Sequence, residues 1–236
     1  MMRAQATKGR ILDAAERLFA ERGFDRTSLR AITSQAGVNL AAVNYHFGTK
    51  DELMHAVFAR RLAPLNARRL AMLDACEAEA GDGPPAVEGV VRAFVEPIVL
   101  VGSAAGLPGL PGLLGRLYSD PSPRVQGIFL SELGETARRF SAAMQRALPT
   151  IPAAEVYWRM GFSIGAMAHT LAASWIVEQL SGGLCNPSDR DRTLQHLIAF
   201  ITAGLNAPVP EVRTERTSRS ARPVLAGRAP RRREKP

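Results

Sequence analysis

The chain has 236 residues, of which 46% are hydrophobic, and its formal net charge is +8. This length fits one or two domains, and the hydrophobic share is large enough for a core, which excludes a disordered or fibrous chain. Cys76 and Cys185 are too few for a disulfide framework, and residues 1–10 are too polar for a secretory signal peptide.

The charge is unevenly distributed. Residues 1–60 contain nine Lys/Arg and six Asp/Glu, residues 61–206 contain twelve and thirteen, and residues 207–236 contain nine and three. Basic ends suit contact with phosphates, whereas a nearly neutral, apolar middle suits a binding pocket. Prolines and glycines interrupt the most apolar segment, residues 90–117, so no stretch reaches the apolar length of a membrane span. We therefore expect a cytoplasmic protein without a membrane partner.

Aromatic residues make up only 6% of the chain, and Ala, Leu, Arg and Glu dominate, which predicts an all-α protein. Apolar residues at helical spacing predict helices over about 7–22, 28–36, 40–46, 50–80, 86–101, 113–118, 123–147, 153–180 and 188–206. The first helix presents one apolar face, formed by Ile11, Ala15, Leu18 and Phe19.

Two short helices follow, joined by a tight turn at Gly37, where a left-handed backbone favours glycine. Thr27 or Ser28 can cap the first of them, and Asn39 can cap the second. This layout is typical of a helix-turn-helix, in which the second helix enters the DNA major groove. The alternative is a plain helical hairpin within a bundle.

The residues on either side of the turn distinguish a helix-turn-helix from a plain helical hairpin. Ala-Glu-Arg-Leu-Phe-Ala-Glu-Arg-Gly-Phe precedes the turn, Ala-Gly-Val forms it, and Tyr-His-Phe-Gly-Thr-Lys-Asp-Glu-Leu follows. In this order and spacing, the motifs over residues 8–58 resemble the DNA-binding domain of the TetR family of bacterial one-component repressors. The resemblance implies an N-terminal three-helix DNA-binding domain and a C-terminal helical bundle that binds a ligand and forms a dimer.

Direct reading of base edges is expected from the predicted recognition helix, residues 40–46. Asn44 can pair with an adenine edge. The TetR family commonly has a tyrosine at this position, which contacts a phosphate. Because this chain has an asparagine there, we do not expect that phosphate contact from residue 44. Tyr45 and Lys50 are candidates for phosphate contacts, and small or apolar residues can contact thymine methyls. The predicted DNA-contacting residues are Thr27, Ser28, Arg30, Asn39, Leu40, Ala41, Ala42, Asn44, Tyr45 and Lys50.

The rest of the chain predicts a second, helical unit. We expect the DNA-binding domain over residues 1–48, a ligand-binding and dimerisation domain over 49–206, and a disordered basic tail over 207–236. The tail is either merely solvated or an arm that adds non-specific DNA affinity. The helices over 153–180 and 188–206 can pair with their copies as a four-helix dimer interface, which implies a palindromic DNA operator.

The ligand is predicted from a narrower resemblance. Gly-Val-Asn-Leu-Ala-Ala-Val-Asn-Tyr-His-Phe-Gly and, more loosely, Tyr-Trp-Arg-Met resemble the PsrA-type branch, whose members respond to long-chain fatty acids. This implies a fatty acid or acyl-CoA effector, with Arg159 or His169 as the favoured partner of its head group. Arg92, Arg116 and Arg138 are further candidates. The predicted ligand-binding residues are Phe94, Ile98, Leu113, Leu117, Phe129, Leu133, Arg159, Met160, Ile164, Met167, His169 and Trp175.

Other classes of function find less support in the sequence. There is no Gly-rich phosphate loop, nucleophile elbow or His/Cys cluster at metal spacing, so we predict no catalytic residues, no cofactor and no metal. A non-specific architectural DNA-binding protein is favoured only by the basic tail. The main alternative is a TetR-type regulator with a different ligand, such as a drug, an aromatic acid or a quorum signal.

Overall fold

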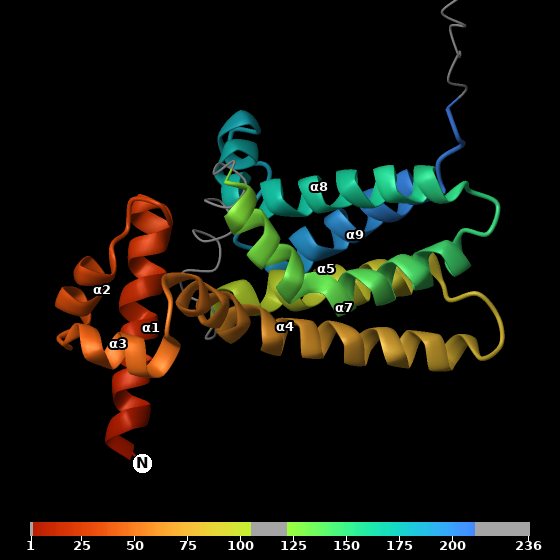
Figure 1. Cartoon of the computed structure of the whole chain (residues 1–236). Helices are drawn as coiled ribbons and strands as arrows, with labels where there is room; N and C mark the ends of the chain where they lie inside the picture. Colours follow the sequence, from red (N-terminus) through yellow and green to blue (C-terminus); the bar gives the residue numbers. More distant parts are fainter. Residues whose placement is uncertain (1, 105–121, 211–236) are drawn as a thin grey trace, which may run out of the picture.

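The computed structural model describes residues 2–104 and 122–210, and this part of the chain is entirely helical (Figure 1). Its helices are α1 (Met2–Arg22), α2 (Leu29–Ala36), α3 (Leu40–Phe47), α4 (Lys50–Ala80), α5 (Val87–Ala104), α7 (Pro123–Ala147), α8 (Ala153–Leu180) and α9 (Arg190–Asn206). The predicted all-α class is confirmed. The predicted helix over 113–118 and nearly all of the predicted tail lie outside the described residues.

Helices α1, α2 and α3 form a small unit at one end of the molecule, and α4 leads from it into the larger bundle (Figure 1). Its core is built from the apolar face of α1 together with Ile32 of α2 and Val43 of α3, all essentially inaccessible to water. Burial of each such side chain contributes about 1.5–3 kcal/mol. A short α3 is thus held by packing rather than by its own helix propensity.

The two short helices begin and end where local chemistry requires. Ser28 caps α2, its Oγ accepting a hydrogen bond of 3.1 Å from the Ala31 amide, and Asn39 caps α3 through a 2.9 Å bond from the Ala42 amide. Gly37 ends α2 in the left-handed region, with φ 63° and ψ 41°. The predicted turn and caps are therefore confirmed, with Ser28 rather than Thr27 as the cap.

Helix α4 is a 31-residue rod that starts beside α3 and continues through Pro64. A reciprocal cap fixes its start, because the Glu52 amide donates to Thr49 Oγ1 at 3.1 Å and the Thr49 amide donates to Glu52 Oε2 at 2.7 Å. Helix α7 lies along α4 (Figure 1). Helix α4 therefore links the larger bundle to the N-terminal unit.

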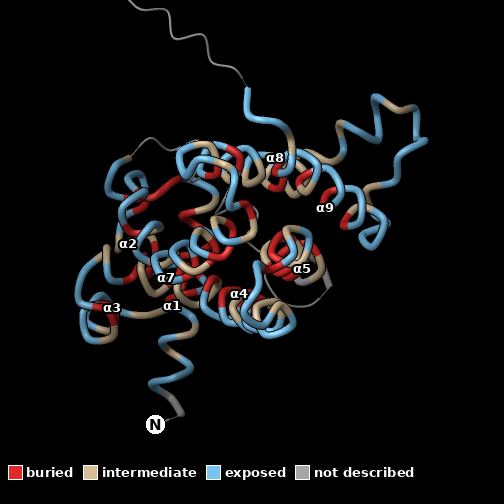
Figure 2. The backbone as a smooth tube through the Cα atoms, turned by 90° about the vertical axis from the view of Figure 1, so that its right-hand side faces the viewer, coloured by how far each residue is buried: buried red, intermediate tan, exposed pale blue. Residues whose placement is uncertain are grey.

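Helices α4, α5, α7, α8 and α9 form the larger bundle, in which α5 packs between α4 and α9. Figure 2 shows buried residues concentrated along the inner faces of α4 and α5, whereas α8 is mostly exposed or half-buried. Residues of α8 that are fully buried are few, namely Val156, Arg159 and Met167. Helix α8 therefore packs on the core with one face and is not enclosed by it.

Helix α8 departs from the sequence-based expectation in two ways. It is broken at Ala173, where φ is −136° and ψ is 22°, whereas one continuous helix over 153–180 was predicted. It is also the one helix in residues 2–104 and 122–210 that is long and apolar enough to cross a membrane, a length that no stretch was expected to reach. Only 6% of the most apolar 18-residue stretch of this helix is buried, so most of its apolar surface faces outward.

Candidate functional site

The outer face of α3 is the most prominent candidate surface of the N-terminal unit. Asn44 and Ala41 are exposed, 83% of Tyr45 is accessible, and Leu40 is 41% accessible. Val43, on the opposite face, is buried. The predicted division of α3 into a packed face and an outward face is therefore present, with polar groups outward.

The residues at the start of α2 have different tasks. Thr27 is 1% exposed, and its hydroxyl group is directed to the backbone oxygens of Gly23 at 2.7 Å and Leu18 at 3.1 Å. Its side chain therefore ties the end of α1 to the start of α2 and is not presented at the surface. Ser28 and Arg30 are exposed and remain accessible to a phosphate.

Lys50, another predicted phosphate contact, is half-buried at the start of α4. Its Nζ lies 4.1 Å from the centroid of the Phe24 ring, and burial lowers the pKa of its ammonium group, with a smaller contribution from Arg124. Arg124, in the first turn of α7, binds Asp51 with Nε 2.7 Å from Oδ2. The larger bundle thus contacts the first turn of α4 directly beside the N-terminal unit.

A buried ionic cluster joins α1 to α4. Glu16 is 4% exposed and accepts hydrogen bonds from Arg60 Nη2 at 2.5 Å and from Arg61 Nε at 2.9 Å. Arg60 also binds Asp13 at 2.7 Å. Charge-assisted bonds are stronger and more directional than neutral ones, so this cluster fixes the angle between the N-terminal unit and α4.

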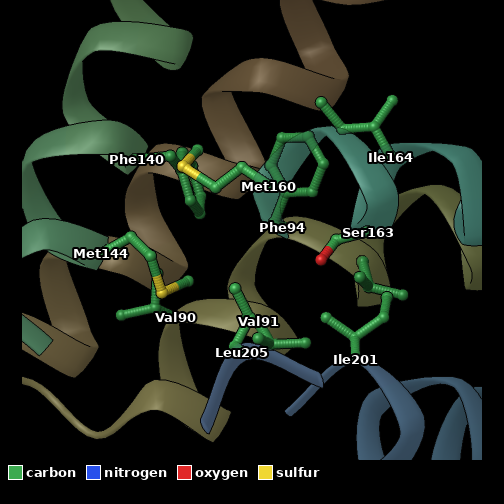
Figure 3. A pocket seen from close by; sticks show the side chains of 11 residues that line it. Val90, Val91, Phe94, Phe140, Met144, Met160, Ser163, Ile164, Ile201 and Leu205 are labelled. Atoms are coloured by element: carbon green, nitrogen blue, oxygen red, sulfur yellow. The ribbon is translucent and has the colours of Figure 1, made fainter. Parts of the chain in front are cut away.

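A narrow apolar cavity of about 40 Å³ lies between α5, α7, α8 and α9 (Figure 3). It is lined by Val90, Val91, Phe94, Val95, Phe140, Met144, Met160, Ser163, Ile164, Ile201 and Leu205. Ser163 is the single polar side chain in this lining. This volume is below the range of small-molecule sites, so a ligand would enter only as the flexible side chains of Met144 and Met160 move aside.

Three predicted ligand-binding residues, Phe94, Met160 and Ile164, line this cavity. The others with described side chains do not, because Ile98 and Met167 are buried elsewhere in the core, Phe129 packs against Phe58 and Leu133 is half-buried. Leu113 and Leu117 lie outside the described residues. The sequence therefore placed three of its predicted ligand-binding residues on this cavity, while the others with described side chains lie elsewhere.

Arg159 is a buried cation, as predicted, but it caps a helix. Its Nη1 donates to the Leu205 and Ala207 oxygens, both at 2.7 Å, and its Nε binds Glu155 at 2.8 Å. These bonds satisfy carbonyls that the end of α9 leaves without helical partners. Its donors are thus already occupied by the fold.

His169 and Trp175 are both exposed, so neither lies in the apolar setting that their sequence neighbours suggested. His169 borders a second hollow of about 330 Å³, between the end of α8 and the start of α9, which is also lined by Arg192 and His196. Within residues 2–104 and 122–210, no group of three or more His, Cys, Asp or Glu residues could hold a metal ion.

Sequence reasoning missed Arg69 on α4, which is 3% exposed and stacks on Phe94 of the cavity wall. A signal was available, because Leu62, Leu65 and Leu73 place position 69 on the same buried stripe of the helix. An arginine at an apolar register position is an anomaly that helical spacing alone can detect.

Two family models match this chain. Residues 11–57 match the model described as bacterial regulatory proteins of the tetR family, and residues 92–204 match the tetracyclin repressor-like C-terminal domain. The first range contains the outward face of α3, and the second contains most of the cavity lining. The two matches thus coincide with the two candidate sites.

Individual relatives resemble the N-terminal unit. The HTH-type transcriptional regulator TtgR of Pseudomonas putida is 46% identical over 54 residues, which are 23% of this chain and 26% of that protein. An HTH-type transcriptional repressor of Mycobacterium tuberculosis is 55% identical over 47 residues, 20% of this chain and 25% of its own. These matches span about a quarter of each relative, and both relatives are regulators, not enzymes.

Solved structures extend the comparison to the whole fold. The fatty acid degradation regulator FadR from Bacillus halodurans aligns with a TM-score of 0.57 at 13% identity, covering 86% of this chain and 97% of that one. At this identity the likeness concerns the fold alone. Because the two family models match in chain order and together account for more than half of the residues, the protein belongs to the TetR family of bacterial regulatory proteins.

Proposed function

We propose that this protein is a sequence-specific transcriptional repressor that binds a palindromic DNA operator as a homodimer and is released by an apolar effector. The observation that carries the proposal is the outward face of α3, where Asn44 and Tyr45 are exposed on a helix whose other face is buried. An amide can read an adenine edge in the major groove, and a tyrosine hydroxyl can bind phosphate.

The outward apolar surface of α8 and α9 supports the dimer. Trp158 and Phe162 stack at 6.0 Å between ring centroids and are 66% and 68% exposed, and Phe200 of α9 is 70% exposed. A Cβ atom built at Gly161 or Gly165 would meet nothing within 4 Å, so another helix can approach closely there. A second copy would cover this surface and pair two recognition helices for a two-fold symmetric operator.

The cavity supports an apolar effector, with a long-chain fatty acid or acyl-CoA favoured. Induction then requires that the effector bind more tightly to the conformation whose recognition helices are wrongly spaced. Helix α4 is the transmitter, because Arg60 and Arg61 bind Glu16 of α1 and Asp51 binds Arg124 of α7. Movement in the bundle thereby changes the position of the N-terminal unit.

Fluorescence anisotropy tests the proposal with DNA from upstream of the protein's own gene and a random duplex as control. Specific binding that Tyr45→Ala weakens, and that oleate or oleoyl-CoA reverses, supports the ligand-released repressor. If binding is specific but neither lipid reverses it, the protein is still a regulator and the proposed lipid effector is wrong. Equal affinity for both duplexes indicates non-specific binding and contradicts the proposal.

A further inference from the structure

Arg69 is a buried cation without an anionic partner. It is 3% exposed on the inner side of α4, and no carboxylate among the described residues forms an ion pair with it. Burial lowers the pKa of its guanidinium group to about 10, so the group is still protonated at neutral pH. A charge in this setting costs several kcal/mol unless an opposite charge compensates it.

The contacts of Arg69 leave one nitrogen of its guanidinium group without a hydrogen-bond partner. Nε donates to the backbone oxygen of Phe94 at 2.9 Å, and the guanidinium carbon lies 4.1 Å from the centroid of the Phe94 ring. Nη2 is buried and has no hydrogen-bond partner in the described part of the chain. An unmade hydrogen bond on a buried charged donor is more costly than one on a neutral group.

Phe94 connects this cation to the apolar cavity. Its ring stacks on Arg69, packs edge-on against Phe140 at 5.1 Å and also lines the cavity, where Figure 3 shows it beside Met160. The cation and the cavity therefore share one aromatic side chain. The Phe94 ring therefore separates the guanidinium group from the cavity, and a ligand in the cavity would reach Arg69 past this one side chain.

Three other arginines of the bundle have acidic partners. Arg159 binds Glu155 and the end of α9, Arg139 binds Asp74 and Glu77, and Arg92 binds Glu88 on the surface. Arg69 thus differs from these arginines in having a buried donor and no acid. The apolar walls of the cavity offer no other charge to a ligand inside it.

We propose that Arg69 is the effector's anion-binding residue, which takes a free carboxylate whose apolar chain lies in the cavity beyond Phe94. This inference rests on the proposed effector cavity and makes it specific. One guanidinium group in an apolar setting balances a single negative charge, which selects a free fatty acid over an acyl-CoA with its several phosphate charges.

Isothermal titration calorimetry of the full-length protein tests this with three C12 probes: dodecanoate, dodecanol and dodecanoyl-CoA. Wild type is expected to bind dodecanoate at least about tenfold more tightly than dodecanol, consistent with the value of a charge-assisted hydrogen bond. Arg69→Met should bind the acid and the alcohol equally. Arg68→Met is the matched control, because Arg68 is adjacent on α4 but exposed, and it should retain the preference.

Stability separates a ligand-binding role from a structural one. Replacing an uncompensated buried charge by an apolar side chain is often neutral or stabilising, so Arg69→Met should melt no lower than wild type without ligand. Arg69→Lys keeps the charge and should retain part of the preference for dodecanoate. The lysine variant and the wild-type probe series remain informative even if Arg69→Met does not fold.

Equal binding of dodecanoate and dodecanol to wild type would overturn the role of Arg69, as would a preference that survives in Arg69→Met. Tighter binding of dodecanoyl-CoA than of dodecanoate would overturn the selection of a free acid. Operator binding by the same samples without ligand reports on the proposed function independently. If the protein binds its operator but shows no preference for dodecanoate over dodecanol, only the role of Arg69 is overturned and the proposed repressor function is not.

Discussion

Two asparagines of α3 illustrate how residues five positions apart have different tasks. Asn39 accepts a backbone hydrogen bond at the start of the helix, whereas Asn44 is exposed with its amide available. One side chain stabilises the fold, and the other is directed at the proposed DNA. The two tasks can be separated by measurement.

Asn39→Ala should lower the free energy of unfolding by about 1 kcal/mol, the usual value of a helix N-cap. Asn44→Ala should change it by less than about 0.5 kcal/mol, as expected for an exposed site. It should weaken operator binding by about 1–3 kcal/mol while binding to a random duplex stays unchanged. Urea unfolding and anisotropy measure the two effects, and equal loss on both duplexes would contradict base reading by Asn44.

Arg69 permits a prediction about pH. Its pKa in the folded protein, about 10, lies below the ordinary value of an arginine, so the unfolded chain binds more protons only between these two values. Stability from this group therefore rises with pH in that window and is constant below it. The difference in unfolding free energy between wild type and Arg69→Met should be flat from about pH 6 to pH 9. A slope in urea titrations over this range would indicate a partner that titrates there.

At the scale of elements, ion pairs join α1 to α4 beside the apolar core that the two helices share. Glu16 is buried and accepts bonds from both Arg60 and Arg61, whereas Asp13 is 66% exposed and binds Arg60 alone. The two acids therefore form a matched pair for testing this junction. Their difference in burial predicts a difference in energy.

Glu16→Gln should lower the free energy of unfolding by about 1–3 kcal/mol, because charged donors lose a buried acceptor charge. Asp13→Asn should cost less than about 1 kcal/mol, as surface ion pairs do. Glu16→Gln should also reduce the release of DNA at saturating effector, while effector affinity measured by calorimetry is unchanged. Full release in Glu16→Gln would show that this junction does not transmit the signal.

At the scale of the whole molecule, the exposed apolar surface of α8 is the proposed dimer interface. Only 6% of the most apolar stretch of α8 is buried, and a monomer with so much exposed apolar surface is unfavourable in water. A second copy would remove it from solvent. Such a dimer also accounts for a helix that meets the length and composition of a membrane span.

Phe162→Glu should convert the dimer into a monomer, because it places a charge at the centre of the proposed interface. Leu130→Glu is the control, since Leu130 is similarly exposed, at 64%, but lies on α7. Sedimentation equilibrium measures the mass, and operator affinity should fall with the loss of the dimer. A Phe162→Glu protein that remains dimeric would place the interface elsewhere.

The helices and their ends could be predicted from the sequence, because they depend on residues three or four positions apart. The apolar spacing located α7 and α8 at their observed bounds, and the cap residues of α2 and α3 were identified by type. The helix-turn-helix motif is likewise local, which is why the outward residues of α3 could be named. Local hydrogen bonds and side-chain spacing determine all of these features.

Tertiary structure alone decided the tasks of the polar side chains, because their partners lie far away along the chain. Arg159 caps α9 through Leu205, 46 positions later, and Thr27 binds the carbonyl of Leu18. Arg69 became a buried cation only when α5 packed over α4. The sequence determined which helices form and which family the chain resembles, whereas desolvation and long-range contacts decided which charges are satisfied and which remains for a ligand.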